Sequence, residues 1–364
     1  MRWSWKIARV AGIDIYMHTT FLLIVVWVGV ANYMAGQSLN AALMGILFLL
    51  ALFLSVVLHE YGHALTARRF GIATRDITLL PIGGVARLER MPEKPIQELW
   101  VALMGPAVNV VIAAVLFVGL LVTGTMQPLS SLSLTDGNFF ERLMVTNLFL
   151  ALFNLLPAFP MDGGRVVRAL LASRMEYTRA TQIAASLGQG IALMLALFGL
   201  FNNPFLLFIA FFVWIGAGQE SDMVQVKSVL AGIPVNRAMI TNFETVAPTD
   251  PLGRAVQLLL AGTQQDFPVT VDGRVVGILT RDDVVRSLAE HNENTLVSFL
   301  MRKEFQTVDS SQMLESTAQI LQPGVQPLLP VVHGGELVGM LTMENLGEFL
   351  MIQRAVKQRK IANS

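Results

Sequence analysis

Long runs without Asp, Glu, Lys or Arg are confined to the first 220 residues of the chain. No Asp, Glu, Lys or Arg occurs between Ile15 and His59, and the stretch from Leu143 to Met161 is equally free of charge. A membrane-spanning helix needs about 20 mostly apolar residues. The pattern therefore predicts six transmembrane helices, at residues 15–33, 41–64, 97–124, 139–157, 181–201 and 204–219.

Basic residues alternate between the two ends of these predicted helices. Lys and Arg are absent from the connections near 34–40, 125–138 and 202–203. They gather before the first helix and in the other connections, namely Arg2, Lys6, Arg9, Arg68, Arg69, Arg75, Arg87, Arg90, Lys94, Arg165, Arg168, Arg174 and Arg179. Cytoplasmic loops are enriched in these residues. We therefore expect both termini in the cytoplasm and the N-terminal segment to be the cytoplasmic flank of the first helix. The membrane is expected to be the inner or plasma membrane if the chain is prokaryotic.

After Glu220 the pattern changes to frequent charges, short strands and turns such as Asp272-Gly273. Sliding the chain on itself by 62 residues aligns Met239 with Met301 and Gly277 with Gly339, which indicates an internal repeat. Each copy is predicted to fold as strand, helix, hairpin and helix. The predicted organisation is a membrane domain 1–220, a linker 221–232, a repeat pair 233–354 (233–292 and 295–354) and a tail 355–364.

Composition agrees with this division and limits the chemistry. Hydrophobic residues make up 54% of the chain and charged residues only 14%, against about 25% charged in typical soluble domains. The fold class is therefore a polytopic α-helical membrane protein with a cytoplasmic α/β repeat. The formal net charge is zero and no basic stretch contains interleaved aromatic residues, so we expect no nucleic-acid partner. The absence of cysteine leaves histidine and carboxylates as ligands for any metal.

The second apolar run ends in the sequence HEYGH, which has the form HExxH. A spacing of four places His59 and His63 on one helix face, about one turn apart. Two imidazoles so placed can bind one Zn²⁺, with Glu60 beside the metal-bound water. This motif also arises by chance in soluble helices. At the end of an uncharged membrane segment, however, ionisable groups favour a functional site.

Catalytic zinc needs a third protein ligand. Asp162 is the first carboxylate after the uncharged stretch that ends at Met161, and the predicted topology places it at the same membrane depth as HExxH. Pro157 and Pro160 rule out a regular helix just before it, and Gly163-Gly164 permits unusual backbone dihedrals around it. The alternative is an ordinary interfacial loop with an Asp-Gly turn.

HEYGH together with NLLPAFPMDGGR resembles the site-2 protease family of intramembrane zinc metalloproteases, over roughly residues 10–220. The resemblance extends to PIGGVARLE at 81–89 and GPAVN at 105–109. It implies that His59, His63 and Asp162 bind one zinc ion per chain and that Glu60 is the general base. It also implies substrate contacts for Asn154, Gly83 and Gly84.

The family resemblance implies substrates that are single-span membrane proteins, such as an anti-sigma factor, a membrane-tethered transcription factor or a signal-peptide remnant. A helical substrate must unwind before its peptide bond is exposed. The alternating segment 76–91 is predicted to form a hairpin, and we expect its edge to pair with the unwound substrate. A plain cytoplasmic loop is the alternative for this segment.

The repeat pair resembles tandem cystathionine-beta-synthase (CBS) modules, because GILTRDD and GMLTMEN match the element G-x-x-[ST]-x-x-[DN]. The resemblance implies that ATP or AMP binds at Thr280 and Asp283, with Thr342 and Asn345 as the corresponding pair in the second copy. Asn345 replaces the expected aspartate, which weakens the second site. A pair that only dimerises or braces the protease is the alternative.

The sequence therefore favours regulated intramembrane proteolysis by a multi-pass membrane protein in contact with the lipid bilayer. Two rival functions remain at this stage. One is a transporter or channel gated by the CBS pair, and the other is a non-catalytic relative that binds membrane proteins without cutting them. The ionisable groups collect at one depth rather than along a pathway, which favours hydrolysis over transport.

Overall fold

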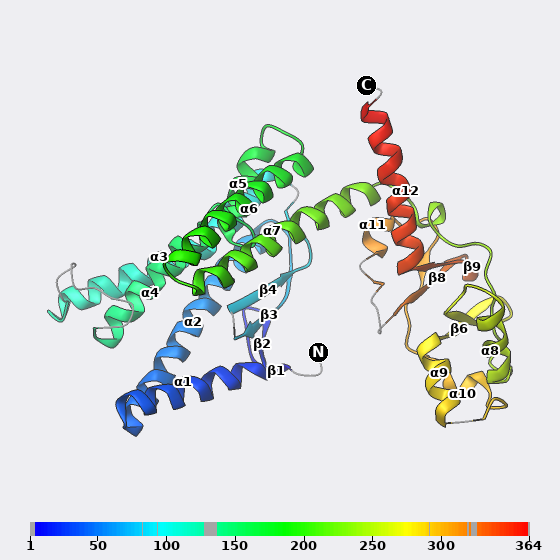
Figure 1. Ribbon diagram of the computed structural model, residues 1–364, viewed down its shortest axis with the longest axis horizontal. Coiled ribbons are helices and arrows are strands. Elements are labelled where there is room, and N and C mark those ends of the chain that lie inside the picture. The colour runs from blue at the N-terminus through cyan, green and yellow to red at the C-terminus, as the bar shows by residue number, and fades with distance from the viewer. Residues whose placement is uncertain are drawn as a thin grey trace. The chain divides into compact units, whose positions relative to one another are not determined.

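The computed structural model describes residues 4–81, 83–92, 94–126, 137–290, 292–318, 320–321 and 326–362. The chain divides into two compact units, residues 1–222 and 223–364. Figure 1 shows the elements of each unit.

The first unit contains seven helices and one sheet among its described residues. The helices are α1 (Thr20–Gly36), α2 (Leu39–Arg69), α3 (Pro95–Val122), α4 (Phe139–Asn154), α5 (Asp162–Ala172), α6 (Tyr177–Phe201) and α7 (Phe205–Leu230). Four of the helices, α2, α3, α6 and α7, are long and apolar enough to cross a membrane. Helix α1 has 17 residues and α4 has 16, so among the described residues the predicted six spans are not confirmed.

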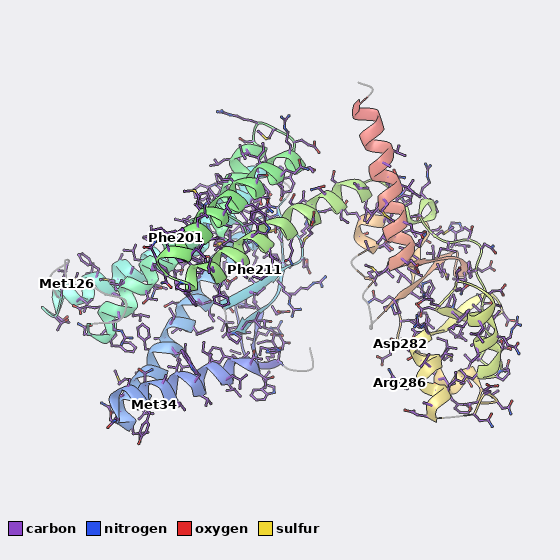
Figure 2. All side chains as sticks on the ribbon, in the orientation of Figure 1. Met34, Met126, Phe201, Phe211, Asp282 and Arg286 are labelled. Atoms are coloured by element: carbon purple, nitrogen blue, oxygen red, sulfur yellow. The ribbon has the colours of Figure 1, made fainter. Side chains whose placement is uncertain are left out.

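Side chains on the outer surfaces of the two units differ in character. Phe201 and Phe211 are 82% and 66% exposed and point outward from the long helices of the first unit (Figure 2). Asp282 and Arg286 are exposed on the second unit. An apolar outer surface on the long helices suits contact with lipid acyl chains, whereas charged groups suit contact with water.

A four-stranded sheet packs against the C-terminal half of α2, the half that the sequence predicts to lie toward the cytoplasm. Its strands are β1 (Ser4–Val10), β2 (Ile13–His18), β3 (Thr74–Leu80) and β4 (Gly83–Leu88), in the order β1-β2-β3-β4. Strands β2 and β3 are parallel and the other neighbours antiparallel. Ile13, Ile15 and Ile77 pack against Tyr61 and Ala64 of α2. The sheet therefore lies directly beside the HExxH turn.

The N-terminal segment corrects one prediction. We expected a flank followed by a helix from residue 15, but residues 4–18 form the β1-β2 hairpin and the helix begins at Thr20. In β2, Ile13 and Ile15 alternate with polar or half-buried neighbours, a period of two that suits a half-buried strand. The predicted hairpin at 76–91 is confirmed as β3-β4, and β4 is an edge strand of the sheet.

The second unit is built from two similar halves. The described elements are η2 (Val235–Arg237), α8 (Leu252–Ala261), β5 (Phe267–Val271), β6 (Arg274–Leu279), α9 (Arg281–Glu290), α10 (Val297–Leu300), β7 (Val308–Asp309), α11 (Leu314–Thr317), β8 (Leu328–His333), β9 (Glu336–Thr342) and α12 (Met343–Ala362). The first strand predicted for copy one is a single bridge, Val246 to Val269. Helices α7 and α12 occupy most of the segments predicted as linker and tail.

The two halves interlock through equivalent contacts. A Cβ added to Gly277 would lie 2.6 Å from the Met301 sulfur, and one added to Gly339 would lie 2.6 Å from the Met239 sulfur. These are the residues that the 62-residue shift pairs. Each copy therefore places its methionine against the glycine of the other, and the small residue permits the close approach.

Candidate metal centre and catalytic site

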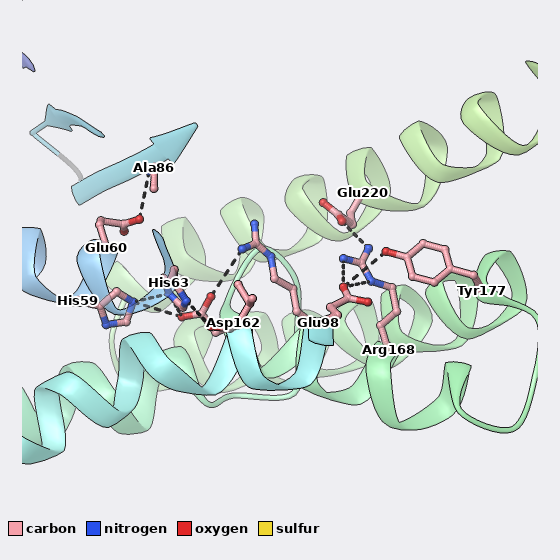
Figure 3. Close-up of polar contacts among 11 residues, drawn as sticks. His59, Glu60, His63, Ala86, Glu98, Asp162, Arg168, Tyr177 and Glu220 are labelled. Carbon is pink, nitrogen blue, oxygen red and sulfur yellow. Dashed lines mark hydrogen bonds and ion pairs between the residues drawn. The ribbon is translucent and has the colours of Figure 1, made fainter. Parts of the chain in front are cut away.

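Two histidines and an aspartate converge between α2 and α5 (Figure 3). The Nε2 atoms of His59 and His63 lie 3.1 Å apart, and Asp162 Oδ2 lies 3.2 and 3.1 Å from them. All three residues are buried, with 5–6% of their surface exposed. The predicted third ligand position is thus brought to the HExxH motif from a helix about 100 residues away in sequence.

Hydrogen bonds on the far side of each imidazole define which nitrogen faces the centre. His63 Nδ1 lies 2.7 Å from the carbonyl oxygen of Val101, which can only accept a proton, so this Nδ1 donates. His59 Nδ1 lies 2.6 Å from Asn109 Oδ1. In the neutral tautomers both Nε2 atoms then carry lone pairs. Two lone pairs and a carboxylate would repel one another unless a cation lay between them, so the residues fit a zinc ion.

A series of hydrogen-bonded polar side chains, which includes residues of two other helices, orients His59. The sequence did not identify these residues as functional. Asn109 Nδ2 donates to Asn147 Oδ1 at 3.1 Å, and Asn147 Nδ2 donates to Ser55 Oγ at 3.2 Å. Asn109 and Asn147 are 1% and 0% exposed. Asn109 ends the GPAVN stretch, which was noticed only as part of the resemblance. Partners of this kind fix the ring orientation of metal-binding histidines.

Helices α2 and α3 approach closely at the candidate metal centre because each has a glycine there, Gly62 on α2 and Gly105 on α3. A Cβ added to Gly62, inside HEYGH, would lie 2.5 Å from the Met104 carbonyl oxygen. A Cβ added to Gly105 would overlap His63 Nε2 and lie 2.7 Å from His59 Nε2. Gly105 therefore leaves open the space in which the two imidazoles converge.

The backbone before Asp162 turns sharply and corrects a second prediction. We expected Gly163 and Gly164 to adopt unusual dihedrals, but neither has a positive φ and both belong to helix α5. A Cβ at Gly163 would overlap the carbonyl oxygens of Leu155 and Leu156 instead. The glycines therefore allow α5 to fold back tightly onto the turn that follows α4, which delivers Asp162 to the centre.

Glu60 lies between the metal-binding candidates and strand β4. Its Oε2 accepts a hydrogen bond of 3.1 Å from the backbone N–H of Ala86. A Cβ added to Gly84 would lie 2.9 Å from Glu60 Cγ, whereas Gly83 sits in the hairpin with φ +142°. Asn154 ends α4 and donates to the Leu150 carbonyl at 2.9 Å. No hydrogen bond among the described residues joins Asn154 to the three candidate ligands.

In the second unit, the predicted nucleotide residues of the first copy bond to one another and to an arginine. Thr280 Oγ1 donates to Asp283 Oδ2 at 2.6 Å, and Arg302 donates to both carboxylate oxygens at 2.7 and 3.0 Å. Burial raises the pKa of Asp283, but hydrogen bonds from Arg302 and Thr280 outweigh it and hold this pKa below its usual value. Arg302 was missed in the sequence.

The corresponding residues in the second copy lack this charge pair. Asn345 N donates to Thr342 Oγ1 at 3.2 Å, while the buried Asn345 Oδ1 has no hydrogen-bond partner among the described atoms. The 62-residue shift places Ile240 where Arg302 stands in the other copy. The aspartate and its arginine are thus replaced together, which leaves no unpaired buried charge at this position of the second copy.

Comparison with known proteins places the chain in a family. The model of peptidase family M50 matches residues 47–135 and 132–197, and the CBS domain model matches residues 234–290 and 297–351. A zinc metalloprotease of Methanocaldococcus jannaschii is 31% identical over 347 residues, covering 95% of this chain and 96% of the relative. The chain belongs to peptidase family M50, the site-2 proteases.

A solved structure is also similar to this M50 protease. It is a site-2 protease from Methanocaldococcus jannaschii, 38% identical, covering 60% of this chain and 95% of that one with a TM-score of 0.44. Family membership makes the protein an intramembrane zinc metalloprotease with a CBS pair. Multi-pass membrane residence and membrane-protein substrates follow from the same membership.

Proposed function

We propose that His59, His63 and Asp162 hold one zinc ion and that Glu60 is the general base for hydrolysis of a peptide bond in or near a transmembrane segment of the substrate. The observation that carries this proposal is the convergence of two Nε2 lone pairs and a carboxylate within 4.8 Å of one another. A third protein ligand with an open fourth position is the arrangement typical of catalytic zinc.

Each residue then has a defined task. Zinc bound here supplies Lewis acidity toward water and the scissile carbonyl. Glu60 lies next to His59 on the helix and its carboxylate can accept the proton of the attacking water and return it to the leaving nitrogen. The Ala86 N–H holds Oε2 of this carboxylate, so Oε1 is the oxygen that would accept the proton.

The edge strand beside Glu60 supports substrate binding by strand addition. Because the Ala86 N–H turns toward Glu60 rather than toward β3, the outer edge of β4 faces the catalytic carboxylate. In an antiparallel pair, backbone groups that face away from the partner strand recur at every second residue, so Gly84 presents its backbone to the same side as Ala86. Gly83, Gly84 and Asn154 are proposed to line the path of the unwound substrate.

Strand addition predicts alternation along the substrate. A single N-methyl group placed at successive positions near the cleavage site should lower kcat/KM at every second position, because methylation removes only the hydrogen bonds that face β4. Quantified cleavage of a peptide series in detergent measures this. An equal effect at adjacent positions would contradict the hypothesis, and unmethylated peptide serves as the control.

Zinc removal tests the proposed function against its two rivals. Dialysis of the full chain against a chelator should abolish cleavage of a single-span substrate, and one equivalent of zinc per chain should restore it. A CBS-gated transporter or a non-catalytic binding relative would give no cleavage in either state. Restoration without zinc, or cleavage unchanged by the chelator, would contradict the proposal.

The topology of the predicted spans is likewise proposed. We infer six spans that include α1 and α4. Both termini and the CBS pair then lie on the cytoplasmic side of the membrane, which is the inner or plasma membrane if the chain is prokaryotic. We also propose that the chain divides into a membrane domain 1–220, a linker 221–232, a CBS pair 233–354 and a tail 355–364. Cysteine accessibility labelling, which the cysteine-free sequence makes simple, tests the orientation.

Regulation by ATP or AMP at the CBS pair is proposed for Thr280 and Asp283, with Thr342 and Asn345 forming a second, neutral pocket. A nucleotide that bonds to Asp283 must compete with Arg302, since both groups already share hydrogen bonds. Calorimetry with Asp283→Asn, and exposed Asp282→Asn as the control, tests the assignment: unchanged binding heat in Asp283→Asn would contradict it. Dimerisation through the CBS pair is tested by light scattering.

We infer as substrates single-span proteins such as an anti-sigma factor, a membrane-tethered transcription factor or a signal-peptide remnant. The support is the family's membrane-protein substrates together with an edge strand that takes an extended chain. A member of each substrate class is incubated with the zinc-loaded protein and with the zinc-free protein, and cleavage is measured. A class that the zinc-loaded protein never cleaves is excluded.

A further inference from the structure

Arg168 is a fully buried arginine that the proposed chemistry does not use. Its side chain is 0% exposed. Figure 3 shows it among Glu98, Glu220 and Tyr177. Nε donates to Glu98 Oε1 at 2.8 Å, Nη2 bonds to the same oxygen, and Nη1 bonds to Glu220 Oε1. The guanidinium carbon lies 5.0 Å from the Phe159 ring centroid and 5.1 Å from that of Tyr177.

The partners of Arg168 stand on the helices that build the metal centre. Glu98 lies on α3, about one turn before Val101, whose carbonyl orients His63, and two turns before Gly105. Arg168 lies on α5, six residues after Asp162, which begins that helix. One salt bridge therefore ties the helix that orients the histidines to the helix that carries the aspartate.

Helix α5 cannot hold its own position. It has 11 residues, and its first turn contains Gly163 and Gly164, the residue type with nearly the lowest helix propensity. Isolated helices of this length are marginal in water. The position of Asp162 relative to His59 and His63 must therefore come from tertiary contacts, and the ion pairs of Arg168 are shorter than those of Asp162 and Arg165 on the same helix.

Stability alone is a poor explanation for this buried ion pair. Desolvation often cancels the attraction in such pairs, and apolar replacements can be equally stable. Glu98 is 1% exposed and its Oε2 has no hydrogen-bond partner among the described atoms. The cluster therefore contains a buried acceptor without a hydrogen bond, which costs stability. The planar guanidinium donates in fixed directions to Glu98 Oε1 and Glu220 Oε1, and these contacts define a geometry more sharply than apolar packing does.

We propose that Arg168 is a positioning residue that sets Asp162 at the metal centre by fixing α5 against Glu98 on α3 and Glu220 on α7. This inference rests on the proposed zinc site. Glu220 lies on α7, which continues to Leu230, so the same arginine also holds the helix by which the chain leaves the first unit.

Arg168→Lys tests the proposal, because lysine keeps the charge and loses the planar fork. We expect the full chain in detergent to bind zinc about 10- to 100-fold more weakly, the range seen when groups behind metal ligands are changed. The absorption spectrum of Co²⁺ in the site should shift, and kcat should fall with KM unchanged. Arg174→Lys, at an exposed position just past α5, is the control and should match wild type.

An unaltered zinc affinity and Co²⁺ spectrum in Arg168→Lys would overturn the proposal even if activity fell. If this variant does not fold, Glu220→Gln decides, since the Glu220 side chain is 24% exposed and tolerates the change more easily. A weaker zinc affinity in Glu220→Gln supports the proposal and an unchanged one overturns it. Failure of the wild type to bind zinc would instead overturn the proposed function.

Discussion

Glu60→Gln is expected to keep zinc bound and to lower kcat by about 10²- to 10⁴-fold, the usual contribution of a general base. Glutamine has nearly the same shape, and its carbonyl oxygen can still accept the hydrogen bond from the Ala86 N–H. It cannot accept a proton from water. The three candidate ligands are His59, His63 and Asp162, so the change removes none of them.

The measurement pairs zinc content with single-turnover cleavage of a single-span substrate in detergent. Glu89→Gln is the matched control, because Glu89 is exposed just after β4 and lies outside the site. Its rate should equal that of the wild type. Cleavage by Glu60→Gln at the wild-type rate would show that another group is the base, and loss of zinc would show that Glu60 belongs to the metal centre.

The local part of the site could be predicted from the sequence because it depends on helix spacing alone. HExxH lies within one stretch of a long helix, so a spacing of four was enough to bring His59 and His63 together. Asp162 was predicted by membrane depth, which limits where charged groups can meet. The structure confirms that these three residues converge, although the reason inferred for Gly163 and Gly164 was wrong.

The parts that the sequence did not predict depend on contacts between distant segments. Strand β2 pairs with β3 across the whole of α1 and α2, and no local pattern specifies that pairing. In the sequence Asn147 is a single polar residue in an apolar segment, and only its hydrogen bonds to Asn109 and Ser55 give it a role. Arg302 likewise acquires its role only from the way the two CBS copies interlock.

Arg168 is another residue whose role the sequence did not predict. The sequence placed it among the basic residues that indicate a cytoplasmic loop, a surface role by default. The structure buries it completely between two carboxylates. Charge counting predicts a side of the membrane but not whether the charge faces water.

Gly105→Ala is expected to remove zinc binding, and cleavage should fall at least about 100-fold, the cost of misplacing catalytic groups by about 1 Å. The added methyl carbon would overlap His63 Nε2 and lie 2.7 Å from His59 Nε2, the two atoms proposed to bind the metal. The imidazoles must move or turn, and either change breaks their convergence with Asp162. Zinc stoichiometry and the cleavage rate of the purified variant measure the effect.

Gly119→Ala is the matched control on the same helix, because a Cβ there meets nothing within 4 Å. Alanine in place of glycine favours a helix by about 0.5–1 kcal/mol. Gly105 precedes Pro106, whose ring disfavours the helical region for a residue with a Cβ, so the thermal stability of both variants is measured beside their zinc content. Equal thermal stability with zinc lost only in Gly105→Ala would separate a steric effect at the metal centre from a folding defect. Full zinc binding by Gly105→Ala would show that the metal lies elsewhere, because the space that Gly105 leaves open would then not be needed.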